Sequence, residues 1–366
     1  MPFWFLSFFF PRCKKTIVFG SWFGERYSDN PMYLFEYANA QFDINCIWIT
    51  NKKSILTKLR SENKKCHLTW SLMGIFYSLR AKIVVVGSGK KDVNPYFING
   101  AVIINTWHGS PMKKIGKSNG HVNSHVINQF KKNFLPNIYE YNIDHIVSSS
   151  WEFDKIMSEA FDVPTDCVLK TGYPRNDVFF KGPKSSFGCL NKIAYLPTFR
   201  DNHSDYDFFN QFEFNNDFIE FLSQNNIELH VGTHFAASNE INIERKSCIK
   251  LIPSGPFFNI NEYLKGIDLV ITDYSGIYFD FLLTGKPIIL AAFDLTFYLE
   301  NCRELNFNYD ELKCYGIANN WNEIHELLKK LLSQNIYLES DRKNISYNDY
   351  NSGNSTELLY NFLKTI

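Results

Sequence analysis

A histidine and two lysines follow a strand-like apolar run within about ten residues. Residues 101–104 are Ala-Val-Ile-Ile, and residues 105–116 read NTWHGSPMKKIG. His108 can accept a proton near neutral pH, because the unperturbed pKa of imidazole is about 6.5. Lys113 and Lys114 would hold phosphate, and Gly109 would let a ligand approach the backbone closely. The alternative is a structural loop histidine.

Two further strand ends carry charged and hydroxyl side chains. After a run at 168–171, the segment TGYPRNDVFF places Arg175 beside Asp177 where a first domain should end, which favours an Arg–Asp pair bracing an interdomain hinge. We also count Arg175 among the candidates for substrate binding. After a run at 192–196, the segment YLPTFRDN brings Thr198 and Arg200, which we expect to face a cleft. Capping of the next helix is the alternative.

The most informative strand end lies in residues 268–290, DLVITDYSGIYFDFLLTGKPIIL. An apolar strand ends at Thr272, a polar loop follows, and a helical pattern begins near Ile277. This order predicts a helix N-terminus with unpaired N–H groups beside Thr272, Ser275 and Gly276, which is a typical phosphate seat. The chain contains neither GxGxxG nor GxxxxGK[ST], so a dinucleotide fingerprint and a Walker A loop are excluded. An ordinary capped helix is the alternative.

A second histidine follows a strand in the other half of the chain. Residues 227–232 form a strand-like run, and His234 comes directly after it in IELHVGTHFAAS. Two histidines on facing domains, His108 and His234, can deprotonate an acceptor and neutralise a leaving phosphate. His230 lies inside the run and is interpreted as a core or edge residue.

The elements that position these side chains alternate along the chain. Short β-branched or aromatic runs predict strands at 16–20, 46–50, 83–87, 102–106, 145–149, 168–171, 192–196, 227–232, 248–252, 269–272 and 287–291. Helix-length segments between them lie at 31–42, 68–79, 150–161, 217–224, 277–284 and 321–332. Near-continuous apolar strands alternating with helices indicate an α/β fold with parallel sheets covered on both faces. Ligands of such sheets bind beyond the carboxyl ends of the strands.

The length and composition allow two domains. The chain has 366 residues, 45% hydrophobic and 17% aromatic, which is enough for two packed cores. The segment KGPKSSFG at 181–188 is the best linker candidate. It divides the chain into an N-terminal domain, residues 1–180, and a C-terminal domain, residues 181–366, whose last helix is allowed to pack back on the first domain.

The distribution of charge suggests what the protein binds, and the cysteine spacing shows whether a metal or redox motif is present. The net charge is zero, yet Lys and Arg outnumber Asp and Glu before residue 180, and the reverse holds after it. The basic half suggests an anionic partner, such as lipid headgroups or phosphorylated substrates, or else uneven solvated charge. The eight cysteines show neither a CxxC pair nor zinc spacing. The N-terminal apolar run is too short to cross a bilayer, but it and residues 125–141 are typical of interfacial segments; packing on the first domain is the alternative for both.

With these strand ends in order, the chain resembles the CDP-glycerol glycerophosphotransferase family, which includes teichoic-acid primases and polymerases and their capsule-polymer relatives. The similarity is carried by GSWFGERYSDNPMYLFEYA, NTWHGSPMKKIG, TGYPRNDVFF, YLPTFRD and ITDYSGIYFDFLLTGKPIILAAFDLTFY. The resemblance implies a GT-B-like fold, with two Rossmann-type domains whose parallel sheets face a cleft and the nucleotide held mainly by the second domain. It also implies a peripheral, monotopic enzyme on the cytoplasmic face of the cell membrane.

The resemblance further implies residue roles. His108 would be the base that acts on the acceptor hydroxyl. His234 matches a histidine that contacts the donor phosphates, although the lysine and proline that usually surround it are missing here. Ser275 and Gly276 match a pyrophosphate-binding turn, and Arg303 matches an arginine that neutralises phosphate charge.

The implied reaction is displacement at the β-phosphorus of CDP-glycerol, with CMP leaving and a lipid-linked or polymeric glycan as acceptor, in teichoic-acid-like or capsular polymer synthesis. A nucleic-acid partner is not expected. No carboxylate cluster signals a metal; Asp273 and Asp280 could recruit Mg²⁺, but we expect Asp273 to be structural. The alternatives are a CDP-ribitol or other polyol-phosphate transferase, a GT-B glycosyltransferase using a UDP-sugar, and a non-catalytic member that binds at the membrane.

Overall fold

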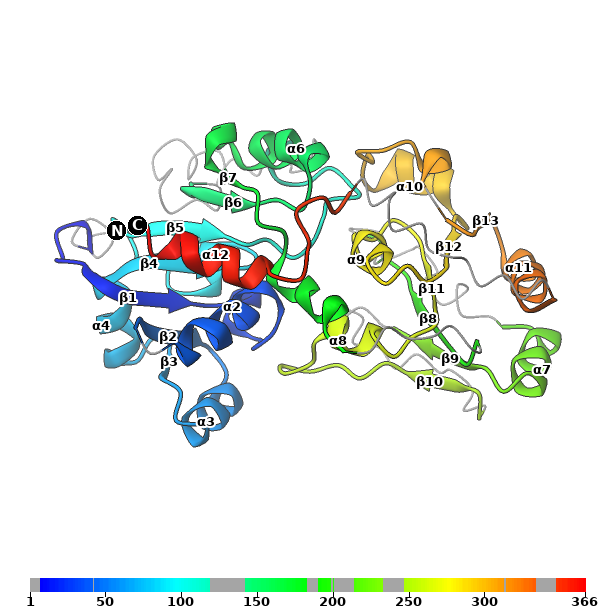
Figure 1. The fold of residues 1–366 in the computed structure, drawn as a ribbon, viewed down its shortest axis with the longest axis horizontal. Coiled ribbons are helices and arrows are strands. Elements are labelled where there is room, and N and C mark those ends of the chain that lie inside the picture. Colours follow the sequence, from blue (N-terminus) through cyan, green and yellow to red (C-terminus); the bar gives the residue numbers. More distant parts are fainter. Residues whose placement is uncertain are drawn as a thin grey trace.

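The computed structural model describes residues 7–41, 43–118, 142–182, 190–198, 200, 214–232, 247–312, 314–333 and 347–366. Two parallel sheets, one in each half of the chain, lie side by side along the long axis of the molecule (Figure 1). The α/β class predicted from the alternating pattern is thereby confirmed.

The first sheet has seven strands in the order β3-β2-β1-β4-β5-β6-β7. Its strands are β1 (Cys13–Phe19), β2 (Asn45–Thr50), β3 (Cys66–Leu68), β4 (Ala81–Val86), β5 (Val102–Asn105), β6 (His145–Val147) and β7 (Val168–Leu169). The connections contain α2 (Asp29–Ala40), α3 (Lys53–Ser61), α4 (Leu72–Arg80) and α6 (Trp151–Phe161), with 3₁₀ turns η1 (Trp22–Gly24), η2 (Lys90–Asp92), η3 (Gly116–Ser118) and η4 (Thr165–Cys167).

Both faces of this sheet are covered, as its apolar strands predict. In β1, Ile17 and Phe19 belong to the hydrophobic cluster shared with α2 and α3, whereas Val18 belongs to the cluster on the opposite face, which α6 covers. All three side chains are buried. Successive residues of a strand point to opposite faces, so a strand that is apolar throughout needs cover on both.

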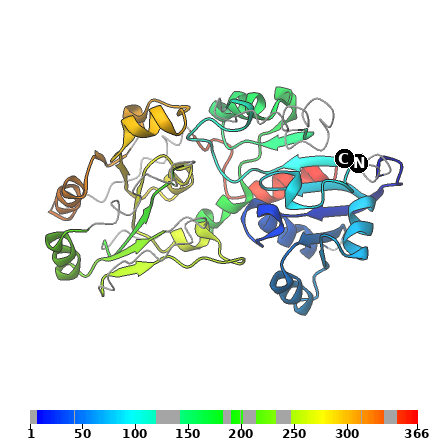
Figure 2. The same cartoon turned by 180° about the vertical axis from the view of Figure 1, so that it is seen from behind.

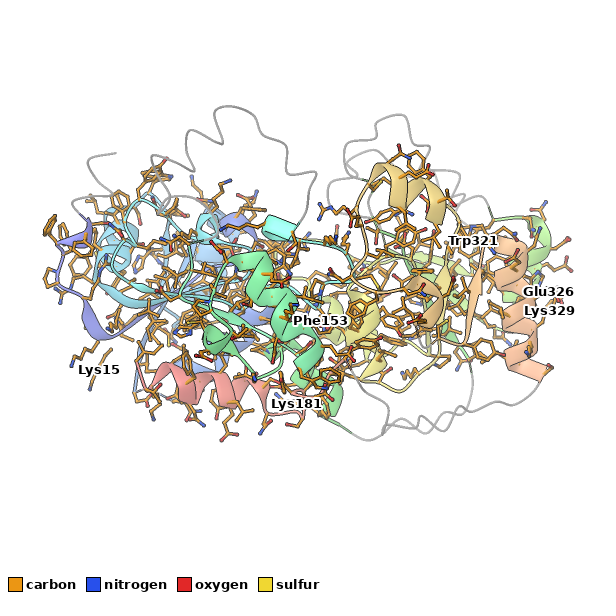
Figure 3. The ribbon with its side chains drawn as sticks, turned by 90° about the horizontal axis from the view of Figure 1, so that it is seen from above. Lys15, Phe153, Lys181, Trp321, Glu326 and Lys329 are labelled. Atoms are coloured by element: carbon orange, nitrogen blue, oxygen red, sulfur yellow. The ribbon has the colours of Figure 1, made fainter. Side chains whose placement is uncertain are left out.

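The second sheet has six strands in the order β10-β9-β8-β11-β12-β13. They are β8 (Lys192–Leu196), β9 (Glu228–Val231), β10 (Ile249–Leu251), β11 (Leu269–Thr272), β12 (Ile288–Ala291) and β13 (Gly316–Ala318). The helices are α7 (Asn216–Gln224), α8 (Ile260–Leu264), α9 (Ile277–Leu282), α10 (Leu295–Asn301) and α11 (Trp321–Ser333), with the turn η7 (Tyr309–Glu311). Figure 3 shows Trp321, Glu326 and Lys329 of α11 at the end of the molecule opposite Lys15.

The last helix lies on the first sheet. α12 (Ser355–Leu363) packs against α2 and against the turn η5 (Pro174–Phe180), and Figure 2 shows it crossing the first sheet. Asp177 in η5 caps it, because the carboxylate accepts hydrogen bonds from the backbone N–H groups of Ser355 and Thr356 at 2.9 Å. The chain therefore passes from the first sheet to the second and returns.

Apolar side chains join the two sheets. Phe153 of α6 and Phe279 of α9 have ring centroids 5.0 Å apart, and Phe307 and Tyr347 pack on the same pair. One hydrophobic cluster consequently extends from the first sheet into the second.

The predicted strands match the observed ones, with two omissions. β3 and β13 were not predicted, because residues 66–68 (Cys-His-Leu) and 316–318 (Gly-Ile-Ala) show no β-branched run. The helix predicted from residue 68 begins at Leu72, after β3, and α9 ends at Leu282, two residues earlier than predicted. Residues 183–188 of the proposed linker and the proposed interfacial segment 125–141 lie outside the described residues.

Candidate functional site

A cleft of about 300 Å³ lies between the two sheets. The first domain contributes the side chains of Trp22, Arg26, Ser28, Asp29, Tyr33 and Arg175 to its wall. The second contributes residues that follow β8, β9, β10 and β11, among them Pro197, Gly232, Pro253 and Ser275. The cleft therefore lies at the carboxyl ends of the second sheet, where ligands of parallel sheets bind.

His108 lies beside this cleft, in the loop after β5. Its ring packs against two indoles in tilted arrangements, with centroid distances of 4.0 Å to Trp107 and 5.2 Å to Trp22. Trp22 in turn lines the cleft. The Nδ1 atom of His108 lies 3.4 Å from the carbonyl oxygen of Gly87. A carbonyl only accepts, so this contact places the proton on Nδ1 and leaves Nε2 as the basic nitrogen.

The surroundings of His108 keep its ring neutral. Burial lowers the pKa of His108 to about 4, and the positive charges of Arg175 and Lys113 act in the same direction, whereas the Asp29 carboxylate opposes them. A neutral imidazole can take a proton from a hydroxyl. His108 therefore has the protonation state that a general base requires at neutral pH.

The backbone around His108 is unusual. Trp107 has φ of 52° and Gly109 has φ of 125°. Across the site, Trp22 and Asp29 also adopt positive φ, at 47° and 67°. A positive φ raises the conformational energy of a non-glycine residue, and such residues cluster at functional sites. The surrounding structure must therefore stabilise Trp22, Asp29 and Trp107 in these conformations.

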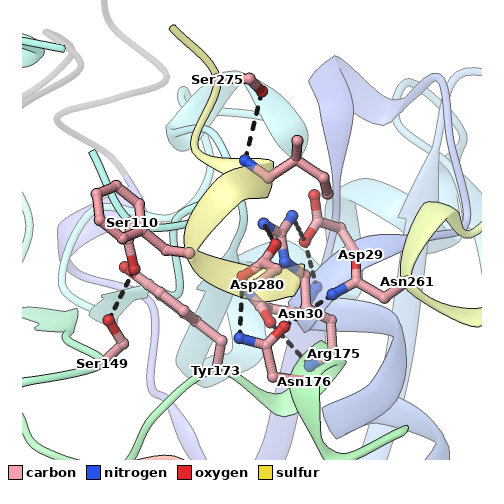
Figure 4. Close-up of polar contacts among 12 residues, drawn as sticks. Asp29, Asn30, Ser110, Ser149, Tyr173, Arg175, Asn176, Asn261, Ser275 and Asp280 are labelled. Carbon is pink, nitrogen blue, oxygen red and sulfur yellow. Dashed lines mark hydrogen bonds and ion pairs between the residues drawn. The ribbon is translucent and has the colours of Figure 1, made fainter. Parts of the chain in front are cut away.

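Arg175 joins the two domains at the floor of the cleft (Figure 4). Its guanidinium forms an ion pair with Asp29 of α2 at 3.1 Å and another with Asp280 of α9. Asn176 donates to Asp280 at 2.9 Å and accepts from Asn261 of α8 at 2.7 Å. Burial raises the pKa of Asp280, and Arg175 opposes that rise. The interpretation of Arg175 as a hinge brace agrees with this geometry, although the bracing carboxylates are not those predicted from the neighbouring sequence.

Two glycines allow close contacts beside the cleft, Gly276 between the domains and Gly109 within the first domain. A Cβ at Gly276 would overlap the carbonyl oxygen of Ser110, and a Cβ at Gly109 would overlap the guanidinium of Arg175. The Ser110 hydroxyl is hydrogen-bonded to that of Ser149 at 2.7 Å. The predicted WHGS loop and the predicted phosphate turn are thus in direct contact.

Ser275 lines the cleft, as predicted, but Thr272 does not. The Ser275 hydroxyl accepts from the backbone N–H of Ile277 at 3.3 Å. Thr272 is fully buried, and its hydroxyl donates to the Leu196 carbonyl at 2.7 Å. The prediction that the Thr272 hydroxyl points into the cleft is therefore wrong, because the hydroxyl bridges two strand ends.

Arg200 also faces inward, contrary to the prediction. It is buried, with ion pairs to Asp273 at 2.9 Å and Asp294 at 2.7 Å, and its guanidinium lies 5.0 Å from the ring centroids of Tyr274 and Tyr298. Both edges of the guanidinium are occupied, so Arg200 fixes the loops after β8, β11 and β12. Asp273, expected to be structural, lies in this same network.

The backbone N–H of Thr198 is hydrogen-bonded, whereas its side-chain hydroxyl is bonded to none of the described residues. Its N–H donates to the Asp273 carboxylate at 2.8 Å. Its buried hydroxyl makes no hydrogen bond to any residue that the structure describes.

The predicted phosphate-binding lysines take part in an interdomain pairing. Lys113 forms an antiparallel bridge with Leu305, and the Lys114 N–H donates to the Glu304 carbonyl at 2.8 Å. The Lys114 ammonium also forms an exposed ion pair with the Glu304 carboxylate, and phosphate binding by Lys114 stays a prediction. Arg303, next in sequence to Glu304, is thereby brought to the loop that carries His108. His234 lies outside the described residues.

Sequence reasoning did not single out Trp22, Asp29 or Asn261. Asp29 lies in the segment GERYSDN, but its role depends on Arg175, 146 residues away. No local pattern carries that pairing. Among the described residues, no group of three or more His, Cys, Asp and Glu side chains could hold a metal ion.

Comparisons with known proteins identify the family of the chain. The family model described as CDP-Glycerol:Poly(glycerophosphate) glycerophosphotransferase matches residues 3–365. The chain is 30% identical to a teichoic acid poly(glycerol phosphate) polymerase of Bacillus spizizenii, over 83% of this chain and 80% of that protein. It is 29% identical to a teichoic acid glycerol-phosphate transferase of Staphylococcus aureus, over 89% and 87% of the two chains.

Two solved structures define the fold. The wall teichoic acid polymerase TagF superposes with a TM-score of 0.75 at 21% identity, over 97% of this chain and 89% of that one. A UDP-GlcNAc 2-epimerase from Neisseria meningitidis gives a TM-score of 0.55 at 11% identity, over 96% and 100%. The predicted GT-B-like arrangement is confirmed. The protein described here belongs to the CDP-glycerol:poly(glycerophosphate) glycerophosphotransferase family.

Proposed function

We propose that this protein transfers glycerol phosphate from CDP-glycerol to a hydroxyl of a lipid-linked or polymeric glycan and releases CMP. The observation that carries the proposal is the neutral His108, packed against two indoles beside an interdomain cleft. Family membership supplies the class of donor. A structure of TagF soaked with CDPG, at 20% identity, has the same fold.

The chemistry is a direct displacement. The acceptor oxygen attacks the β-phosphorus of CDP-glycerol, and the bond from that phosphorus to the bridging oxygen breaks. The electron pair of that bond leaves with CMP. The acceptor proton passes to Nε2 of His108, because Nδ1 already carries a proton directed at the Gly87 carbonyl.

Charge must be offset on the leaving phosphate. Ser275 in the cleft wall, the unbound Thr198 hydroxyl near it and Arg303 are our candidates within the described residues, together with His234 outside them. Removing one such partner costs about 100- to 1000-fold in rate in comparable sites. Arg200 and Thr272 are withdrawn as ligands, because they are buried and their polar groups bind protein atoms, whereas Lys114 remains a candidate.

We propose that the acceptor is presented at a membrane surface and that the protein binds there peripherally, on the cytoplasmic side. Within the described ranges, none of the helices combines the length and the apolar character that crossing a bilayer requires. The basic excess of the first half favours contact with anionic headgroups.

The test is CMP release from CDP-glycerol, CDP-ribitol and a UDP-sugar in turn, with and without Mg²⁺, by the wild type and by His108→Ala. His67→Ala is the matched control, since burial also lowers the pKa of His67, which pairs with Arg60 away from the cleft. We expect release from CDP-glycerol that only His108→Ala abolishes. Equal release by His108→Ala would refute the assigned base, and release from the UDP-sugar alone would refute the donor.

A further inference from the structure

Four backbone N–H groups converge on one buried carboxylate near His108, that of Asp92 at the end of η2. Its Oδ2 atom accepts hydrogen bonds from the N–H groups of Gly87 and Ser88 at 2.7 Å each, and from that of Gly89 at 3.4 Å. Its Oδ1 atom accepts from the N–H of Phe23 at 2.7 Å. Burying a charge is unfavourable unless it is hydrogen-bonded, and an ionised carboxylate, which only accepts, can satisfy all four donors.

One of these donors belongs to the peptide unit that also contacts His108. The N–H of Ser88 donates to Asp92, and the carbonyl oxygen of the same unit, that of Gly87, lies 3.4 Å from Nδ1 of His108. The N–H and C=O of a trans peptide point in opposite directions, and no peptide bond between described residues is cis. Holding the N–H on the carboxylate therefore aims the carbonyl at the imidazole.

The donor from Phe23 connects the same carboxylate to an aromatic neighbour of His108. Phe23 follows Trp22, whose indole packs on the imidazole with a centroid distance of 5.2 Å. Both residues adopt positive φ, 47° for Trp22 and 57° for Phe23, a conformation that the surrounding structure must hold in place. The hydrogen bond to Asp92 Oδ1 lies inside this turn. Asp92 thus orders both the hydrogen-bond partner and one ring contact of His108.

We propose that Asp92 is a positioning residue for His108 and acts on it through the peptide unit between Gly87 and Ser88. The inference rests on the proposed function, in which Nε2 of His108 takes the acceptor proton. The carboxylate polarises the Ser88 N–H, and this increases the partial negative charge on the Gly87 carbonyl oxygen. That oxygen keeps the proton on Nδ1 and stabilises the positive charge that develops on the ring as Nε2 is protonated. Asp92 itself receives no proton.

Asp29 cannot take this part alone. Its carboxylate accepts a hydrogen bond from the indole N–H of Trp22 at 3.2 Å, but it is also ion-paired with Arg175 at 3.1 Å. The charges of Asp29 and Arg175 act on the pKa of His108 in opposite directions. The hydrogen bonds that Asp92 accepts come instead from the backbone on which the ring rests, so the geometry of that backbone depends on this carboxylate.

The first experiment is steady-state kinetics of Asp92→Asn, which keeps the shape of the side chain but removes its charge and one acceptor oxygen. The matched control is Asp268→Asn. The Asp268 carboxylate also accepts from successive N–H groups, those of Asn191 and Lys192 at 3.0 and 2.9 Å, but at the amino end of β11, away from the cleft. For Asp92→Asn we expect kcat to fall about 10- to 100-fold with KM for CDP-glycerol unchanged, the range found when a group that orients a metal-ligating histidine is removed. The control should keep the wild-type kcat.

The second experiment reads the His108 ring directly. Nitrogen-15 NMR of histidine-labelled protein at pH 7 distinguishes a proton on Nδ1 from one on Nε2, and the His108 signals are those missing from His108→Ala. We expect the proton on Nδ1 in the wild type and in Asp268→Asn, and a mixture of the two tautomers in Asp92→Asn. This measurement needs no substrate. Absence of CMP release from every protein would therefore refute the proposed function, while the spectra would still test the role of Asp92.

Three results would overturn the inference. They are a wild-type ring protonated on Nε2, a folded Asp92→Asn with the wild-type kcat, and a folded Asp92→Asn with the wild-type tautomer, which would limit the carboxylate to stabilising the turn. Thermal unfolding establishes whether the variant is folded. Should Asp92→Asn fail to fold, the wild-type spectrum decides: a slowly exchanging proton on Nδ1 supports the inference, and a proton on Nε2 refutes it.

Discussion

The contact between Gly276 and Ser110 offers a sharp test of how the cleft is assembled. Gly276 lies where α9 begins, and an added Cβ would fall well within the 3.0 Å that real Cβ atoms respect toward the Ser110 carbonyl oxygen. Gly276 has φ of −62° and ψ of −14°, which alanine adopts without strain. Gly276→Ala therefore changes the contact between the domains and leaves the local backbone preference intact.

The magnitude follows from the size of the overlap. The added Cβ would lie 2.4 Å from the Ser110 carbonyl oxygen, whereas ordinary contacts begin at 3.4 Å, so the Ser110 loop must move by roughly 1 Å. Overpacking of this kind costs about 1–3 kcal/mol, offset by about 0.4–1 kcal/mol from the reduced freedom of the unfolded chain. A misplacement of about 1 Å near the reacting groups can lower the rate about 100-fold. We expect a small loss of stability and a large loss of activity.

The assay compares CMP release and thermal unfolding for the wild type, Gly276→Ala and Gly266→Ala. Gly266 is the matched control, since the nearest atom to its added Cβ is the Tyr263 carbonyl oxygen at 3.7 Å, an ordinary contact. Gly266→Ala should be fully active. If Gly276→Ala releases CMP at the wild-type rate and unfolds at the wild-type temperature, the contact does not set the register of the two domains and the reasoning fails.

Three further outcomes are expected. The pKa of His108 is about 4 in the folded protein and about 6.5 in the unfolded chain, so the ring stays neutral from pH 8 to 6 and kcat/KM should show no acidic limb in that range. Because the unfolded chain binds the proton more readily, the free energy of unfolding should decline as the pH falls from about 6.5 to 4. A loss of kcat/KM centred near pH 6.5 would contradict the assignment. Arg200→Met leaves the Asp273 and Asp294 carboxylates without their guanidinium and should cost about 3–5 kcal/mol in urea unfolding, whereas an unchanged midpoint would mean that the network is not stabilising. Asp177→Ala removes the cap of α12 and should lower the free energy of unfolding by about 1–2 kcal/mol and speed hydrogen exchange over α12. Asp177→Asn should largely restore the slow exchange. Unchanged exchange in Asp177→Ala would show that the cap is dispensable.

The strands were predictable because their residues are apolar throughout, and the loops that carry chemistry were predictable because they follow those strands. His108 and Ser275 were found in this way, and both lie at the cleft or beside it. β3 and β13 were not found, since Cys-His-Leu and Gly-Ile-Ala contain no β-branched run that marks a strand.

The direction of a polar side chain in these loops was not predictable. Arg200 and Lys114 have the composition of phosphate ligands, but their partners Asp294 and Glu304 are 94 and 190 residues away. A pairing over such a distance leaves no periodic trace in one sequence. The same reason hides Asp29, because its ion-pair partner Arg175 is 146 residues away in the sequence.

The return of α12 to the first sheet has a mechanical consequence. Because the chain passes from the first sheet to the second and returns with α12, two separate passages connect the lobes, and a movement of one lobe relative to the other involves both. A fragment ending at residue 180 would also be incomplete, because Leu359, Tyr360 and Leu363 fill the groove beside α2. The first lobe therefore depends on the C-terminal helix to complete its core, and the two lobes are interdependent as folding units.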